Sequence, residues 1–110
     1  MAENLYDSSE LIELRKAGDQ PEGYTTILNL IEFPKGVELT RLKAVYPTRE
    51  DFDNALTWSA ELLKRGTPIP ALDLVISAIA VRLNLQLVTR DQHFKRIKPI
   101  VKELVLLAQP

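Results

Sequence analysis

The sequence contains no cysteine among its 110 residues. This absence excludes a disulfide scaffold, a thiolate zinc site and a thiol nucleophile. Any metal ion must therefore be held by oxygen atoms or by the single histidine, His93. Repeats, low-complexity tracts and glycine-rich or serine-rich linkers are also missing. We accordingly expect one domain over residues 1–110, a length that can close a hydrophobic core without cross-links.

Long hydrophobic runs and excess positive charge are lacking as well. The apolar stretches are too short to span a bilayer, and Met1–Asn4 has no basic region followed by an apolar segment. These features predict a cytoplasmic protein that does not contact a membrane. The net charge of −1 argues against a broad cationic surface for nucleic acid. If a phosphate group is to approach, a divalent cation among carboxylates has to supply positive charge.

What the sequence does contain is an alternation of strand and helix patterns. The predicted strands cover residues 5–6, 24–27, 42–46, 85–88 and 101–107. The predicted helices run from a cap at Ser8 or Ser9 to Gly18, from Asn29 onward, from a capping box at Thr48–Asp51 to Gly66, over 71–81 and over 92–96. This order predicts an α/β fold, a three-layer α/β/α arrangement around a mainly parallel sheet of about five strands.

Three local features sharpen these expectations. Pro34 is tolerated only in the first turn of a helix, so either a helix begins near Phe33 or the helix after Asn29 bends there. The segment 71–81 is apolar nearly all round and should be buried. The long helix before it carries an apolar stripe at helical spacing, made of Phe52, Ala55, Leu56, Ser59, Leu62 and Leu63.

Four acidic residues occupy positions that suggest chemistry. Asp7, Glu32 and Asp91 follow the first, second and fourth predicted strands, where open α/β sheets bind their ligands. Asp73 lies inside the most apolar helix, where a lone charge costs several kcal/mol unless it is paired or bound to metal. Converging carboxylates recruit cations, and hard oxygen ligands favour Mg²⁺ or Mn²⁺. The joint pattern predicts a metal site suited to phosphodiester hydrolysis.

Each acid also has a structural interpretation when it is taken singly. Asp7 and Asp91 could be helix N-caps, and Glu32 could be a solvated acid in a first helical turn. Asp73 could instead form a buried ion pair. Its partner would be one of three basic residues, Lys64, Arg65 or Arg90.

Other polar residues are candidates for supporting roles beside the acids. The hydroxyls of Ser8 and Thr89 could orient a ligand, although capping and turn formation explain them equally well. Asn29 is expected to cap a helix. His93 is interpreted as structural, because no second histidine or cysteine is available for a nitrogen or sulfur site.

Three segments carry recognisable motifs. They are Tyr6–Ser9, the strand and cap of 26–32 leading to Glu32, and a stretch that joins Gly66-Thr67-Pro68-Ile69-Pro70, Asp73 and Thr89-Arg90-Asp91-Gln92-His93-Phe94. Together they resemble the motifs of PIN-domain ribonucleases and, within that family, of VapC toxins from prokaryotic toxin–antitoxin pairs. The resemblance spans nearly the whole chain and is most specific in its C-terminal half.

This resemblance implies a PIN fold and a Mg²⁺- or Mn²⁺-dependent endoribonuclease. Its metal-binding and catalytic carboxylates would be Asp7, Glu32, Asp73 and Asp91. It also implies an antitoxin protein as partner and a homodimer. The chain is shorter than usual for the family after Asp7 and after Glu32, so the helices that form the lid and antitoxin groove should be trimmed. The candidate contacts to RNA are Arg90, Lys64 and Arg65.

Two other functions compete with this hypothesis. One is a PIN-like binding module that retains the acidic cluster without cutting any substrate. The other is a receiver-like signalling domain, which Asp7 and Thr89 fit superficially. A receiver needs paired acids after its first strand and a lysine at a late strand end, and Ser8 and Lys102 do not supply them.

Overall fold

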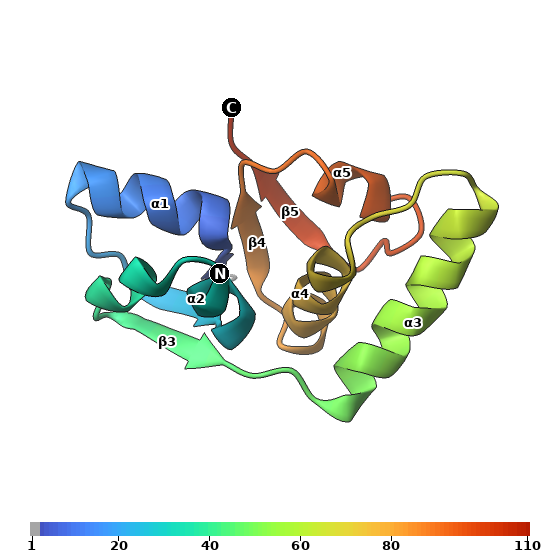
Figure 1. Cartoon of the computed structure of the whole chain (residues 1–110), viewed down its shortest axis with the longest axis horizontal. Helices are drawn as coiled ribbons and strands as arrows, with labels where there is room; N and C mark the ends of the chain where they lie inside the picture. Colours follow the sequence, from blue (N-terminus) through green and yellow to red (C-terminus); the bar gives the residue numbers. More distant parts are fainter. Residues whose placement is uncertain (1–2) are drawn as a thin grey trace.

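The computed structural model describes residues 3–110, so Met1 and Ala2 of the polar N-terminal segment lie outside the described residues. The strands are β1 (Asn4–Tyr6), β2 (Gly23–Thr26), β3 (Leu42–Val45), β4 (Gln86–Thr89) and β5 (Val105–Ala108). The helices are α1 (Ser8–Ala17), α2 (Ile27–Glu32), the 3₁₀-helix η1 (Pro34–Glu38), α3 (Arg49–Lys64), α4 (Ala71–Arg82) and α5 (Phe94–Ile97). Strands and helices thus alternate along the chain (Figure 1).

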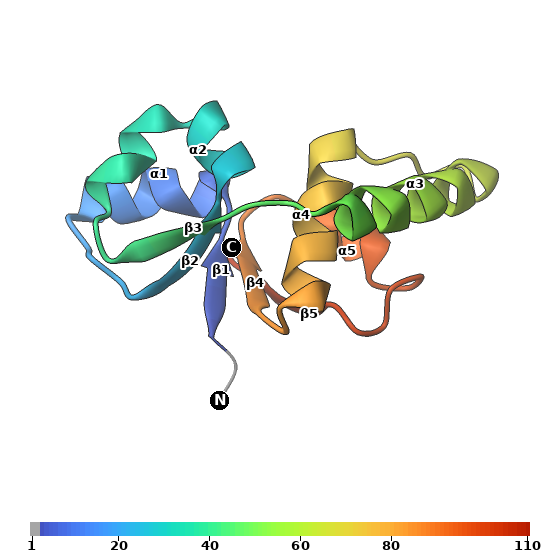
Figure 2. The ribbon, with the colours of Figure 1, turned by 90° about the horizontal axis from the view of Figure 1, so that it is seen from below.

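The strands form one parallel sheet in the order β3-β2-β1-β4-β5. Leu5 of β1 pairs with Tyr24 of β2 and with Leu87 of β4, so β1 lies at the centre. Because crossovers between parallel strands are right-handed, α1 and α2 cover one face and α4 and α5 the other. Figures 1 and 2 show these two groups of helices on opposite sides of β1 and β4. The predicted α/β fold class is confirmed.

Between β1 and β4 the strand order reverses. The chain leaves β1 toward one face and leaves β4 toward the other, which opens a crevice at the carboxyl ends of these two strands. Open α/β sheets bind ligands at such a point. The fold therefore brings the residues after Tyr6 and after Thr89 to the place where a site is expected.

The core lies between the sheet and α4. Leu5 and Leu87 are fully buried, and α4 is buried over residues 74–80, as its all-round apolar sequence predicts. Helix α3 packs along α4 at the edge of the molecule. Only part of its apolar stripe is covered as a result: Ala55 and Leu62 are buried, whereas Phe52, Leu56 and Leu63 are 52%, 72% and 63% exposed.

Within residues 3–110, no helix combines the length and apolarity needed to cross a bilayer.

Helix α1 begins one residue earlier than the sequence suggested. The predicted cap at Ser8 or Ser9 is wrong, because Asp7 caps the helix by accepting a hydrogen bond from the backbone N–H of Glu10 at 3.1 Å. An extended backbone at Asp7 lets its side chain fold back over the first turn. The predicted end is confirmed, since Gly18 adopts a left-handed conformation with φ 72°.

Helix α2 is capped by Thr26, whose Oγ1 accepts the backbone N–H of Asn29 at 3.1 Å. The expected cap at Asn29 is therefore wrong, because β2 ends earlier than predicted and the helix has already begun at Ile27. Helix α2 stops at Glu32, and Pro34 opens η1 as a separate turn. The expectation that a turn starts near Phe33 is thus confirmed.

The capping box at Thr48–Asp51 is confirmed at the start of α3. Asp51 is completely buried and also accepts hydrogen bonds from Arg82, with Nε at 2.9 Å and Nη2 at 2.9 Å. Arg82 ends α4, so this ion pair connects the first turn of one helix to the last turn of its neighbour.

Strand β5 begins later than predicted, at Val105, because the chain first makes a turn with Val101 and Leu104 buried.

Candidate active site

The carboxyl ends of β1 and β4 carry two of the predicted acids. Asp7 directly follows β1, and Asp91 lies two residues beyond the end of β4. Asp73 approaches from the other side of the crevice, in the first turn of α4. A helix N-terminus is favourable for negative charge, which helps to explain an acid at the head of an apolar helix.

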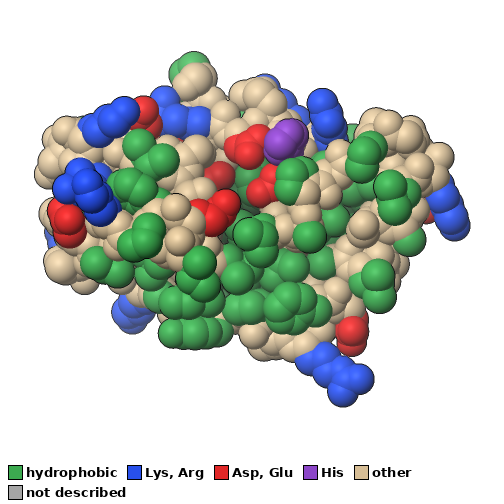
Figure 3. Space-filling view, in the orientation of Figure 1, with side chains coloured by type: hydrophobic (Ala, Val, Ile, Leu, Met, Phe, Trp, Pro, Cys, Tyr) green, Lys and Arg blue, Asp and Glu red, His purple; other side chains and the backbone are tan. Residues whose placement is uncertain are grey.

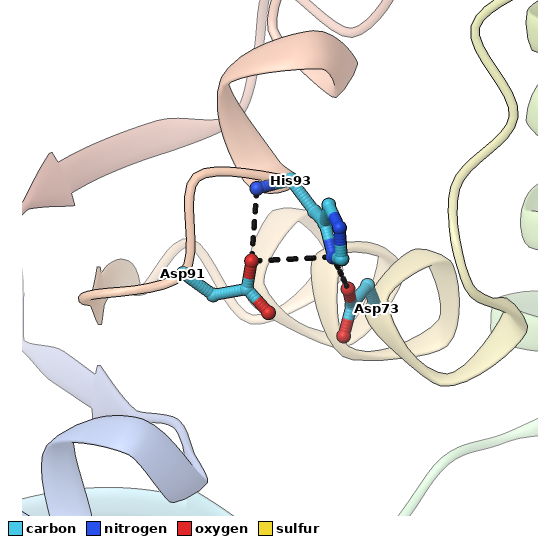
Figure 4. A group of neighbouring side chains, drawn as sticks. All are labelled: Asp73, Asp91 and His93. Carbon is cyan, nitrogen blue, oxygen red and sulfur yellow. Dashed lines mark hydrogen bonds and ion pairs between the residues drawn. The ribbon is translucent and has the colours of Figure 1, made fainter.

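Two of these acids meet around the histidine (Figure 4). His93 Nδ1 lies 3.2 Å from Asp73 Oδ2 and 3.2 Å from Asp91 Oδ1. The backbone N–H of His93 also donates to Asp91 Oδ1 at 2.9 Å. One ligand atom from each of the three side chains lies within 4.8 Å of the other two. The structure thus brings Asp73, Asp91 and His93 together.

Asp7 lies deeper, with only 3% of its surface exposed. Its Oδ1 accepts from Ser9 Oγ at 2.6 Å, and its Oδ2 accepts from the hydroxyl of Thr89. Thr89 Oγ1 also accepts the backbone N–H of Asp91 at 2.9 Å. One threonine hydroxyl therefore connects Asp7 to the turn that carries Asp91.

Burial raises the pKa of Asp7 above its ordinary value. Hydrogen bonds from Ser9, Thr89 and the Glu10 backbone act in the opposite direction without cancelling the effect of burial. The negative charge of Asp91 adds to the rise. The charges of Asp7 and Asp91 therefore repel each other, although Asp7 is outside the close group around His93.

Burial also raises the pKa of Asp73, in this case to about 6. Repulsion from Asp91 contributes next, and a smaller contribution comes from Glu32. The hydrogen bond and charge of His93 pull the pKa the other way but do not compensate. The cluster consequently disfavours the ionised form of its carboxylates. A positive charge nearby would stabilise that form.

Glu32 stands apart from the close group. It is exposed at the end of α2, and its Oε1 accepts a hydrogen bond from Ser8 Oγ at 3.3 Å. Its charge nevertheless raises the pKa of Asp73. Ser8 therefore contacts one of the four acids at an exposed position. Asn29 is fully buried near Glu32 on the same helix, and among residues 3–110 its Nδ2 is the one buried side-chain nitrogen or oxygen without a hydrogen-bond partner.

The donor set fits a divalent cation. Asp73 and Asp91 offer hard carboxylate oxygens, and His93 offers an imidazole nitrogen within 4.8 Å of them. Carboxylate-rich sites suit Mg²⁺ and Mn²⁺, and imidazole adds affinity for later transition metals. On the face shown in Figure 3, acidic side chains and the histidine lie together and border a continuous apolar area.

Two of the three basic residues proposed from the sequence form other ion pairs. Arg90 Nε donates to the buried Glu10 at 3.1 Å, and its Nη1 donates to the carbonyl of Pro110 at 3.0 Å. Arg65 pairs with Glu61 at 3.2 Å on the surface of α3, and Lys64 is exposed beside it. Within the described part of the chain, Asp73 pairs with His93 and with no lysine or arginine. The alternative that Lys64, Arg65 or Arg90 neutralises Asp73 is therefore wrong.

Sequence reasoning treated His93 as structural and so missed its place between the two acids. The signal was present in the spacing, because His93 lies two residues beyond Asp91 in a turn. In this turn the side chains of Asp91 and His93 lie close together (Figure 4). Its contact with Asp73 depends on how α4 crosses the sheet, which no local pattern specifies.

Comparisons with known proteins agree with this geometry. A family model described as the PIN domain matches residues 5–99. A search of curated proteins finds no match.

Solved structures with similar folds include VapBC-1 from nontypeable Haemophilus influenzae, at 20% sequence identity and a TM-score of 0.74, covering 96% of each chain. They also include DNA-bound VapBC from Salmonella typhimurium, at 17% identity and a TM-score of 0.71, covering 98% of each chain. A third is VapBC2 from Rickettsia felis bound to a DNA fragment of its promoter, at 20% identity and a TM-score of 0.69, covering 96% of this chain and 97% of that one.

These structures share the fold of this chain over nearly its full length. The family model covers β2, β3, β4 and most of β1, together with Asp7, Glu32, Asp73 and Asp91. The chain therefore belongs to the PIN domain family.

Proposed function

We propose that this protein is a divalent-metal-dependent endoribonuclease, the toxin of a VapBC-type toxin–antitoxin pair. The observation that carries the proposal is the convergence of Asp73 and Asp91 on one imidazole at the switch point of a PIN fold. Clusters of repelling carboxylates at such a point are suited to binding a cation and, through it, a phosphate.

The residues that would hold the metal are Asp73 and Asp91, with Asp7 and Glu32 at the margin of the cluster. When bound, Mg²⁺ or Mn²⁺ supplies positive charge for the phosphodiester and promotes ionisation of the attacking water. No covalent nucleophile from the protein is needed for such a hydrolysis.

The chain's own residues position the acids. Thr89 holds Asp7 and the backbone of Asp91 with one hydroxyl, which limits how far the two acids can separate. Ser8 would limit the movement of the exposed Glu32 through its hydrogen bond to Oε1. Because burial and mutual repulsion disfavour ionisation of Asp73, this carboxylate gains more from an approaching cation than an ordinary surface acid does.

The substrate would reach the acids across their solvent-exposed side. Glu32 and His93 are accessible there, with the His93 side chain 42% exposed. Arg90 immediately precedes Asp91, and Lys64 and Arg65 end α3, so these cations are the proposed contacts to RNA phosphates.

The proposed partners are an antitoxin protein and a second copy of this chain. The similar structures from H. influenzae, S. typhimurium and R. felis are VapBC assemblies, which supports an antitoxin partner here by analogy. Helix α3 exposes Phe52, Leu56 and Leu63, an apolar surface of the kind that protomers cover. We place the protein in the cytoplasm, where RNA and such a partner would be present.

Cleavage of labelled RNA by the purified protein tests this proposal. We expect cutting with Mg²⁺ or Mn²⁺, none with a chelator, and loss of cutting in Asp73→Asn and Asp7→Asn. Asp19→Asn, at an exposed position after α1, is the matched control and should cut like the parent. Equal activity in the parent and both site variants would trace the cutting to a contaminant. Metal uptake without any cutting across diverse RNAs would favour the non-catalytic binding module.

A further inference from the structure

His93 occupies a position that its sequence context did not reveal. It is the sole histidine of the chain, and Nδ1 of its ring lies 3.2 Å from an oxygen of each of Asp73 and Asp91. From this geometry we infer that His93 is a nitrogen ligand of the metal held by these two acids, and that it shifts the preference of the site from Mg²⁺ toward Mn²⁺ and later transition ions. The inference rests on the proposed metal site and adds a ligand to it.

The separations agree with a shared ion. Neighbouring ligands of an octahedral ion with bonds of about 2.1 Å are about 3.0 Å apart. The two contacts of Nδ1 are 3.2 Å each, so small movements of the side chains would place all three atoms around one cation. Surface ion pairs of histidine usually involve one carboxylate, whereas this nitrogen faces two carboxylates that come from different elements, α4 and the turn after β4.

The orientation of the ring is also suitable. Nδ1 faces the acids, and the side chain as a whole remains 42% exposed. Nδ1 lies within hydrogen-bond distance of both carboxylates, at 3.2 Å from each. A cation held by the two carboxylates would take the lone pair of Nδ1 as an additional ligand.

The backbone fixes this arrangement before any ion binds. Asp91 Oδ1 accepts the backbone N–H of His93 at 2.9 Å, so the turn determines the relative position of the two residues. Thr89 holds the backbone N–H of Asp91 from the other side. A ligand pair separated by one residue and held by its own backbone is preorganised for a cation.

The expected consequence is a change in metal selectivity. Carboxylates and water alone favour Mg²⁺ and Mn²⁺ with little discrimination, but an imidazole nitrogen strengthens binding along the series from Mn²⁺ toward Co²⁺ and Zn²⁺. His93→Asn puts an amide close to the position of Nδ1. The amide can still hydrogen-bond to the acids but has no nitrogen lone pair for a metal.

The direct test is pulsed electron paramagnetic resonance of Mn²⁺ bound to protein in which histidine alone carries ¹⁵N. Because the chain has one histidine, any ¹⁵N coupling reports His93, provided that no histidine tag remains. We expect a coupling typical of a directly bound imidazole in the parent and in the control Gln92→Ala, an exposed neighbour in the same turn. His93→Asn should lose the coupling, and calorimetry should show about tenfold or more weaker Mn²⁺ binding with a smaller change for Mg²⁺.

The possible failures are distinguishable. Bound Mn²⁺ without ¹⁵N coupling, or an unchanged Mn²⁺ to Mg²⁺ affinity ratio in His93→Asn, would overturn the ligand role of His93 and leave the carboxylate site intact. If the parent binds no Mn²⁺ at all, the proposed function fails and the ligand role fails with it.

Discussion

The effect of burial and like charge on the acids of the site is clearest at Asp73. Its side chain is only 15% exposed and lies beside Asp91 without a lysine or arginine partner in the described chain. Burial and like charge therefore oppose its ionised form, and His93 offsets only part of this. Because the site destabilises its own ionised carboxylates, the folded protein should be more stable with a cation bound there than without one.

Replacing Asp73 by asparagine should stabilise the metal-free protein near neutral pH. Folding raises the pKa of Asp73 from 3.8 to about 6, so the folded state retains a proton that the unfolded chain releases. The free energy of unfolding therefore falls as the pH rises from about 4 to about 6, and the penalty persists above that interval. Allowing for solvent screening, the gain at pH 7.5 is on the order of 2 kcal/mol.

Urea unfolding in the presence of a chelator measures this gain. Asp73→Asn and the parent should have similar stability at pH 4 and should diverge at pH 7.5. A variant that is less stable than the parent at pH 7.5, or that gains equally at both pH values, would contradict the account of Asp73.

Thr89 is predicted to hold the two strand-end acids together. Thr89→Val keeps the shape of this fully buried side chain but leaves Asp7 Oδ2 without its donor and the Asp91 backbone N–H without its acceptor. We expect a loss of about 1–3 kcal/mol in stability and weaker metal binding. Thr25→Val is the matched control, because buried Thr25 on β2 donates to the carbonyl of Tyr6 and its side chain has no hydrogen bond to an acid within residues 3–110.

Thermal unfolding and calorimetric titration with Mn²⁺ separate the two variants. Both should melt earlier than the parent, but only Thr89→Val should bind the ion more weakly. Equal metal affinities in Thr89→Val and Thr25→Val would show that the hydroxyl of Thr89 does not position the acids.

At the scale of helices and strands, sequence patterns predicted the existence and order of the elements better than their ends. The strand and helix alternation, the helix over 71–81 and the Thr48–Asp51 box follow from periodicity and local hydrogen bonding, and the structure contains them, although the helix is buried only over 74–80. The caps of α1 and α2 were misplaced because serine, asparagine, aspartate and threonine compete for the same role within a few residues. The residue that becomes the N-cap is determined by where the preceding strand leaves the sheet.

The connection between α3 and α4 rests on Arg82 and Asp51. Burial raises the pKa of Asp51, but hydrogen bonds from Arg82 and the Thr48 backbone outweigh burial, so the pKa lies below its ordinary value. The stabilisation is present above the ordinary pKa of aspartate and is lost as the pH falls through the lowered one. Arg82→Leu would leave a buried, unpaired carboxylate and should cost about 3 kcal/mol.

Arg65→Leu is the matched control for Arg82→Leu, because its pair with Glu61 is largely exposed and ends the neighbouring helix. Its removal should change stability by less than about 1 kcal/mol. Denaturant titrations of both variants at pH 7 measure the difference. Comparable losses in the two would mean that the buried pair is not what ties α3 to α4.

At the scale of the whole molecule, the fold and the positions of Asp7 and Asp91 follow from strand order, since acids after parallel strands meet at one edge. Asp73 could be identified only as an unexplained charge in an apolar helix. The role of Glu32 at the margin and the approach of His93 could not be predicted, because both depend on how separate helices cross the sheet.

The exposed apolar residues of α3 predict self-association. Phe52 and Leu56 line a groove of about 240 Å³ between α3 and α4 that solvent enters in the isolated chain. Leu56→Glu should convert the proposed dimer to a monomer without unfolding it, because Leu56 is 72% exposed. Val37→Glu, at a similarly exposed apolar position on η1, should leave the dimer intact. Sedimentation analysis measures the oligomeric state of the parent and of both variants. A monomeric parent would rule out this dimer.

Carboxylates that are far apart in the sequence are proposed to bind one divalent cation together. Isothermal titration of the metal-free protein with Mn²⁺ and Mg²⁺ at neutral pH measures this binding. We expect saturable uptake by the parent and by Asp19→Asn, and loss of uptake in Asp91→Asn, which removes an acid from the close group. No uptake by the parent, or the same uptake in Asp91→Asn, would contradict this proposal.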